Sequence, residues 1–337
     1  MSTKLPIILA IILYVLIYYV RLQQGGWDIK PNLFLKERQA LDKISQRLLP
    51  SPQAELLSGI VLGQKKDLPF DLRLALRDTS TLHIVVVSGQ NLTLLAGLIM
   101  RLAGLLTRRV AIGLTFFAIS AYTLLTGAEI PVLRAGAMVG LAYLAQLTGR
   151  ESDGWKVLTA TAAAFLLINP RWTVDLSFQL SFLATFGVIV VAPILAERLK
   201  MLPLFLRENL SVTLAAQIMV TPVIAQNFHQ ISLVGLVTNL FVLWTTSYIM
   251  AVGMIMFLVG GVWQFGSEVL ATFLNVLLTY FVYVVKFFAS LPFAWEYVGE
   301  QVWVVWVGYY LVVAGILSML SLKNGQTKNF ARSTKSD

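Results

Sequence analysis

The chain has 337 residues, of which 57% are hydrophobic and only 13% charged, whereas soluble domains carry about a quarter charged residues. With a mean hydropathy of +0.76, this composition excludes an ordinary soluble protein and predicts an all-α, polytopic membrane bundle of about ten spans with broken helices. The net charge of +9 favours anionic partners, either membrane lipids or a nucleic acid, and no metal or cofactor is expected because cysteine is absent and histidine occurs twice.

The first 80 residues combine one predicted span with a polar segment. No small-residue cleavage site follows the run Leu5–Val20, which indicates a first span retained within residues 1–24 rather than a signal peptide. Residues 25–80 mix apolar and charged positions at helical spacing, which predicts an extracytoplasmic amphipathic segment on the membrane surface. Pro50 and Pro52 are expected to divide its helices.

Residues 81–322 hold the other candidate spans, and the polar residues 323–337 predict a disordered cytoplasmic tail. The candidate after the first runs from Leu82 to Leu106, and the longest, Ile231–Gly261, has room for a break near Gly253. Short loops rich in lysine and arginine alternate with loops poor in them, which predicts an even number of spans and two cytoplasmic termini.

The stretch Thr81–Met100 reads as a span, yet the sequence Ser-Gly-Gln-Asn interrupts its middle. Ser88 and Gly89 can break the helix, and Gln90 and Asn91 would then cap a second half whose free N–H groups attract an anion. The alternative is that Gly89 allows two helices to pack closely while Ser88 bonds a neighbouring helix.

The stretch Thr126–Gly136 carries an arginine inside a predicted span. Glu129 precedes Pro131, an arrangement typical of a helix N-terminus, and Arg134 lies one turn further on. A guanidinium at that depth has to face a carboxylate, carbonyl groups, water or a phosphate. Two interpretations stay open, namely a structural ion pair with Glu129 or Asp175 and direct contact with an anionic ligand.

Two later stretches bring further polar groups into the membrane. Asp175 is expected to cap a helix whose serines serve packing, while Gln179 could line a polar route. Gln226 and His229 follow a proline that kinks or ends a helix, and Asn239 lies inside the next span. His229 is interpreted either as an interfacial loop residue or as part of that route.

The loop charges place several of these polar residues at the outer ends of different spans. That shared side predicts a polar vestibule open to the outside, above a narrower hydrophobic path. The residues concerned are His83, Glu129, Arg134, Asp175, Gln226 and His229.

Four ordered segments between Gly59 and Trp244 resemble the ComEC/Rec2 competence family, the inner-membrane channel for DNA uptake. Asn91 and Pro131 replace the family's usual histidine and small residue, and Trp244 replaces a proline. The matching residues are Gly63, Thr81, His83, Ser88, Gly89, Thr126, Gly127, Arg134, Ala135, Asn169, Pro170, Asp175, Ser177, Phe178, Gln179, Ser181, Phe182, Pro222, Phe228, Ser232, Gly235 and Asn239.

The resemblance implies a channel, not an enzyme, that passes single-stranded DNA into the cytoplasm during natural transformation. It implies a DNA receptor and a cytoplasmic helicase as partners, and it leaves a separate nuclease and a homo-oligomer open. Family members often add an OB-like domain, for which this chain has no room, and a metallo-β-lactamase-like domain, whose metal motif is missing here. Because no P-loop motif is present, a partner motor or an ion gradient is expected to supply the energy.

The residues expected to contact DNA or another anion combine the motif residues with the polar positions above. They are His83, Ser88, Gly89, Asn91, Glu129, Arg134, Asp175, Gln179, Gln226, His229 and Asn239. Outer basic residues could collect the strand or bind lipid headgroups, namely Lys65, Lys66, Arg73 and Arg77.

Two other functions compete with the channel. A secondary transporter of a small anionic solute would use the same broken helix and arginine. An intramembrane enzyme would need His83 and Ser88 as base and nucleophile, but their separation of five residues is poor for one helix face.

Overall fold

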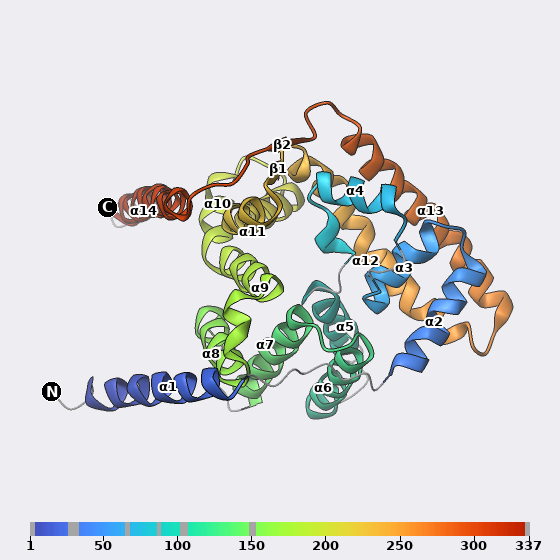
Figure 1. Ribbon diagram of the computed structural model, residues 1–337, viewed down its shortest axis with the longest axis horizontal. Helices are drawn as coiled ribbons and strands as arrows, with labels where there is room; N and C mark the ends of the chain where they lie inside the picture. Colours follow the sequence, from blue (N-terminus) through green and yellow to red (C-terminus); the bar gives the residue numbers. More distant parts are fainter. Residues whose placement is uncertain are drawn as a thin grey trace.

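The computed structural model describes residues 4–25, 34–64, 68–85, 89–101, 107–147 and 153–333. Nearly all of these residues are helical, which confirms the all-α membrane bundle (Figure 1). In chain order the elements are α1 (Lys4–Gln24), α2 (Leu35–Leu48), α3 (Gln53–Leu62), α4 (Phe70–Asp78), η1 (Leu82–Ile84), α5 (Gly89–Arg101), α6 (Arg108–Leu125), α7 (Ile130–Leu147), α8 (Gly154–Ile168), η3 (Pro170–Val174), α9 (Leu176–Phe186), η4 (Gly187–Val191), α10 (Ala192–Arg198), α11 (Leu204–Phe228), β1 (Gln230–Ser232), α12 (Gly235–Val259), α13 (Gln264–Ala289), β2 (Trp295–Tyr297) and α14 (Trp303–Ser333).

Helix length separates the apolar elements into two groups. The described helices long and apolar enough to cross a membrane are Leu176–Arg198, Leu204–Phe228, Gly235–Val259, Gln264–Ala289 and Trp303–Leu320. Shorter apolar helices lie at Leu9–Gln24, Gln53–Leu62, Val110–Leu125, Ile130–Leu141 and Gly154–Ile168. Because a helix needs about 20 residues to cross the hydrocarbon core, the total of about ten spans stays a prediction.

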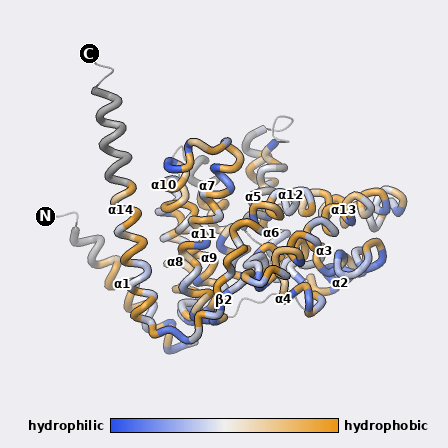
Figure 2. Tube along the Cα trace, turned by 90° about the horizontal axis from the view of Figure 1, so that it is seen from above, coloured by the Kyte–Doolittle hydropathy of each residue, from blue (hydrophilic) through white to orange (hydrophobic). Residues whose placement is uncertain are grey.

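The helices form two groups joined by a third (Figure 1). Helices α2, α3, α4, α12 and α13 lie together on one side, helices α8 to α11 lie on the other, and α5, α6 and α7 lie between them. Figure 2 shows hydrophobic residues along most helices and hydrophilic ones on α2 and at several helix ends. Helices α1 and α14 stand at the same edge of the molecule in both views.

Helix α3 lies inside the first group, although the sequence assigned it to a membrane-surface segment. Leu56, Leu57 and Ile60 are fully buried in the largest hydrophobic cluster, which also includes side chains of α12 and α13. Gly253 of α12 packs on this helix so closely that a Cβ there would lie 2.8 Å from Leu57 Cδ1. Gly253 therefore serves helix packing within a continuous α12, which does not contain the break that the length of the span left room for.

Helices α9 and α10 form one span with a π-helical turn, η4, between them, and this span packs along α11. Gly187 begins η4 at the closest approach, where an added Cβ would lie only 2.5 Å from the Ala215 carbonyl oxygen. Glycine thus allows the two backbones to come together at this crossing.

Helix α11 continues through Pro222, where a kink or an end was predicted. Proline has no N–H, so the Ile218 carbonyl, four residues earlier, loses its donor within the helix. The Tyr309 hydroxyl donates to that carbonyl at 3.0 Å, and the Tyr310 hydroxyl donates to the Met219 carbonyl at 2.8 Å. Helix α14 therefore replaces the missing donor, which lets α11 remain helical.

The structure describes the proline pair between α2 and α3 and most of the C-terminal tail. Helix α2 ends at Leu48 and α3 begins at Gln53, so the proline pair divides the helices as expected. Helix α14 runs to Ser333, so most of the predicted disordered tail is helical. The tail contains no proline and a single glycine, Gly325, so nothing in its sequence forces the helix to end.

Candidate functional site

Helix α5 of the interrupted span is described from Gly89 to Arg101. Residues 86–88 and 102–106, on either side of it, lie outside the described residues, so the predicted break at Ser88 and Gly89 stays a prediction. Before it stands one 3₁₀ turn, Leu82–Ile84, rather than a second half-helix. Ser88 lies outside the described residues, so its contact with an anion or a neighbouring helix stays a prediction.

Asn91 is buried with 1% of its surface exposed and holds α5 against α3. Its side-chain N–H donates to the Ile60 carbonyl at 3.0 Å, and the Tyr122 hydroxyl donates to the next carbonyl, Val61, at 2.7 Å. Two polar side chains thus bind the last turn of α3, whose carbonyls have no partners within the helix. The observed role of Asn91 is structural, and an anion contact by it stays a prediction.

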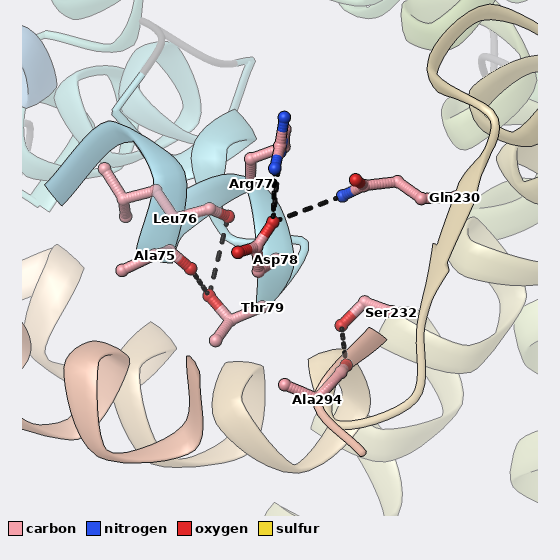
Figure 3. A network of polar contacts seen from close by, with 8 residues as sticks. All are labelled: Ala75, Leu76, Arg77, Asp78, Thr79, Gln230, Ser232 and Ala294. Carbon is pink, nitrogen blue, oxygen red and sulfur yellow. Dashed lines mark hydrogen bonds and ion pairs between the residues drawn. The ribbon is translucent and has the colours of Figure 1, made fainter. Parts of the chain in front are cut away.

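His83 is exposed on the turn that follows α4, and Figure 3 shows the polar contacts at the end of that helix. Its Nδ1 lies 2.9 Å from the Ser80 carbonyl oxygen. Before this turn, Asp78 pairs with Arg77 at 3.0 Å and accepts a hydrogen bond from Gln230 of β1 at 3.4 Å. These contacts attach the end of α4 to β1.

The outer basic residues differ in whether the structure describes them and in the partners that they have. Arg77 has the carboxylate partner just described, and Arg73 also has an interaction within the chain. Lys65 and Lys66 lie outside the described residues. Collection of a strand by these side chains therefore stays a prediction.

The turn between α6 and α7 is built around Gly127 and receives a guanidinium from α2. Gly127 has φ +86°, and a Cβ on it would lie 2.7 Å from Arg38 Nη2. Arg38 Nε donates to the Leu125 carbonyl at 2.8 Å, which satisfies the end of α6 and favours its dipole. Partial burial lowers the pKa of Arg38, and the negative charge of Glu129 opposes that fall. The charge of Glu129 thus acts on Arg38 of α2, an interaction that its sequence neighbourhood did not suggest.

Arg134 lies on α7 with 8% of its surface exposed and reaches α9. Its Nη1 donates to the Ser181 carbonyl and to the Thr185 hydroxyl, and its guanidinium carbon lies 6.0 Å from the centre of the Phe182 ring. Its buried Nε has no hydrogen-bond partner. The described part of the chain contains no ion pair to Arg134, so the predicted pairing with Glu129 or Asp175 is replaced by neutral ligands.

Asp175 caps α9 as the sequence predicted. Its Oδ1 accepts a hydrogen bond from the backbone N–H of Phe178 at 2.9 Å. Gln179 donates from Nε2 to the Thr173 carbonyl at 2.8 Å, across the same helix start. Both side chains therefore shape the N-terminus of the helix that supplies the ligands of Arg134.

The remaining predicted residues belong to α11 and α12. Gln226 Oε1 accepts a 2.6 Å hydrogen bond from Trp306 Nε1 of α14. His229 ends α11 with φ +56°, and its carbonyl accepts a hydrogen bond from the Val298 N–H at 2.9 Å. Asn239 is 5% exposed, and its buried Oδ1 has no hydrogen-bond partner.

The described residues of this set lie on the turn after α4, on α5, at the start of α7 and of α9, and around the turn from α11 to α12. Arg134 and Asn239 combine burial with an unpartnered polar atom, whereas Asn91 and Gln226 bond other helices of the bundle and Gln179 bonds the turn before its own helix. A single vestibule shared by all of them stays a prediction. The described residues contain no cluster of His, Asp and Glu suited to a metal ion.

Together, the fold and these positions define a polytopic helical membrane protein with polar side chains inside its bundle. A sequence model of the competence protein family matches residues 60–323. Since the match covers most of the chain, the chain belongs to the competence protein family.

Two curated relatives show how far the similarity extends. "ComE operon protein 3" of Bacillus subtilis (strain 168) is 29% identical over 214 residues, which is 61% of this chain and 26% of that protein. "Uncharacterized protein YcaI" of Escherichia coli (strain K12) is 29% identical over 224 residues, 63% of this chain and 30% of that protein. The chain thus spans less than a third of the length of either relative, and no solved structure matches it.

Proposed function

We propose that this chain forms the inner-membrane channel that passes single-stranded DNA into the cytoplasm during natural transformation. Family membership and the relative named after the ComE operon support a role in competence. The long apolar helices support a location in the membrane. The observation that carries the proposal is the environment of Arg134.

A buried guanidinium without a carboxylate has an unbalanced positive charge. Burial in a medium of low dielectric makes that charge costly, and an anion close by offsets the cost. The ligands of Arg134, a carbonyl and a hydroxyl, hold the side chain without cancelling its charge, and its buried Nε has no hydrogen-bond partner. This arrangement suits weak and reversible binding of a phosphate group of the strand.

The proposed function also requires components other than this chain. A DNA receptor delivers the strand, a cytoplasmic helicase or the ion gradient supplies energy, and both termini of this chain lie in the cytoplasm. The chain itself acts as a conduit and catalyses no reaction. A separate nuclease and assembly into a homo-oligomer are compatible with this role.

The test is transformation of a deletion strain complemented with Arg134→Ala, with labelled DNA followed across the inner membrane. Loss of one charge-assisted hydrogen bond of about 1.5–3 kcal/mol predicts a roughly 10- to 100-fold fall in uptake. Arg171→Ala is the matched control, because Arg171 is an exposed arginine outside α7. Normal uptake by Arg134→Ala, at the same membrane abundance as the control, would refute the proposal.

Arg134 also fits a transporter of small anions, so the test has to separate the two. Purified chain in liposomes would show saturable uptake of a small anion, without competition from DNA, if the transporter were the correct function. Uptake of labelled single strand that unlabelled strand competes away supports the channel.

A further inference from the structure

A groove lies between the first half of α11 and the middle of α12. It encloses about 720 Å³, a size typical of sites for small organic ligands. Aromatic rings and small polar groups share its lining, with Phe205, Asn209 and Thr213 on α11 and Trp244, Ser247 and Tyr248 on α12. The groove contains none of the residues that the sequence assigned to the polar path.

The aromatic side of the groove is held in place and is open to a ligand. The Trp244 and Tyr248 rings lie 6.2 Å apart in an edge-to-face arrangement, and Tyr280 packs on Trp244 at 5.6 Å. The Tyr280 hydroxyl in turn donates to the Phe241 carbonyl at 3.3 Å. Trp244 and Tyr248 nevertheless keep 42% and 56% of their surfaces exposed. Fixed rings with open surface form a stacking platform that loses little conformational freedom on binding.

The polar side of the groove is neutral. Asn209 donates to the Phe205 carbonyl of its own helix at 2.9 Å, which leaves its side-chain oxygen as an acceptor. The hydroxyls of Thr213 and Ser247 can each donate and accept. The described residues that line the groove include no carboxylate.

We propose that this groove binds the nucleobases of the single strand, stacked on Trp244 and Tyr248 and hydrogen-bonded by the neighbouring amide and hydroxyls. The inference rests on the proposed function and gives it a second kind of contact, to bases instead of phosphates. Every base has a flat π face, and groups that both donate and accept can serve any of the four bases. The groove therefore binds without regard to sequence, as uptake of arbitrary DNA requires.

An acyl chain is a poorer occupant of this groove. Its methylene groups cannot bond the amide and the two hydroxyls, and polar groups left unpaired against hydrocarbon cost free energy. A base satisfies them while covering the same aromatic surface.

The experiment uses the full chain in nanodiscs and two labelled oligonucleotides of equal length. One is oligodeoxythymidylate and the other is its abasic counterpart, which keeps the phosphates and lacks the bases. The variant Trp244→Leu, Tyr248→Leu is expected to bind the thymidylate about 5- to 150-fold more weakly and the abasic strand unchanged. Trp244→Phe keeps a ring and should retain most of the affinity.

The control is Trp303→Leu, which removes an exposed tryptophan on α14, outside the groove, and should change neither affinity. Equal loss for both oligonucleotides, or no loss for either, overturns the groove as a base site. A change in co-purified phospholipid without any change in thymidylate affinity also overturns it, because the occupant would then be lipid. A failure of the proposed channel function would give a different result, namely normal DNA uptake by cells that carry Arg134→Ala.

Discussion

The contact between α14 and the proline of α11 makes a quantitative prediction. In α11, Pro222 leaves the Ile218 carbonyl without its helical donor, and Tyr309 of α14 supplies a hydroxyl at 3.0 Å. Tyr309→Phe removes that donor while keeping the ring and its packing. Within the described part of the chain, the carbonyl then lacks both its helical donor and the hydroxyl that replaced it, so this substitution should cost more than loss of an ordinary interhelical hydrogen bond.

The expected magnitude follows from two limits. Interhelical hydrogen bonds measured in membrane proteins average about 0.6 kcal/mol and reach about 1.7 kcal/mol. An unsatisfied buried acceptor costs about 1–3 kcal/mol. The Tyr309 site is only partly buried, so we expect Tyr309→Phe to lower the free energy of unfolding by about 1–2 kcal/mol.

A double-mutant cycle isolates the cause. Pro222→Ala restores an N–H that can bond the Ile218 carbonyl within α11, so Tyr309→Phe should become nearly neutral in that background. Tyr310→Phe is the matched control, because its acceptor, Met219, keeps a possible helical donor in the N–H of Val223. Denaturant unfolding of the purified chain in micelles gives the four free energies of each cycle. An equal cost of Tyr309→Phe with and without Pro222 would refute the reasoning.

Three further substitutions test other contacts. Gly187→Ala forces a methyl group against the Ala215 carbonyl and should destabilise the chain by about 1–3 kcal/mol or more, measured by denaturant unfolding in micelles. Gly127→Ala imposes φ +86° on a residue with a side chain and displaces the Arg38 guanidinium; we expect a loss of about 1–2 kcal/mol, and a loss below about 0.5 kcal/mol would contradict this account. Asp175→Ala should remove about 1 kcal/mol by deleting a helix cap, whereas Asp175→Asn should retain most of the stability, and equal losses in thermal unfolding would exclude capping.

Features that depend on neighbours in sequence were predictable. The capping by Asp175 and the position of Pro131 in the first turn of α7 follow from local backbone chemistry. Membrane character and the helical class follow from composition. Each of these inferences needs only a few adjacent residues.

Features that depend on distant packing were not predictable. Arg38 bonds a carbonyl 87 positions away, and Arg134 reaches a carbonyl 47 positions away, so no local spacing reveals either contact. The burial of α3 could not be predicted, because its short apolar run is compatible with a position on the membrane surface or in the core of the helix bundle. The glycine of α12, Gly253, was ambiguous for the same reason, because close packing and a helix break both favour a residue without a side chain.

The neutral ligands of Arg134 and the neutral groove between α11 and α12 share one property under the proposed function, namely that neither would hold the DNA strand tightly. A conduit has to bind its cargo well enough for entry and weakly enough for release. A carboxylate beside Arg134 would cancel its attraction for phosphate, and a cluster of arginines would hold a polyanion too tightly. One cation held by a carbonyl and a hydroxyl lies between these extremes. Under the proposed function, stacking on Trp244 and Tyr248 would also be modest for each base and renewed by the next one, so neither contact would require the strand to stop.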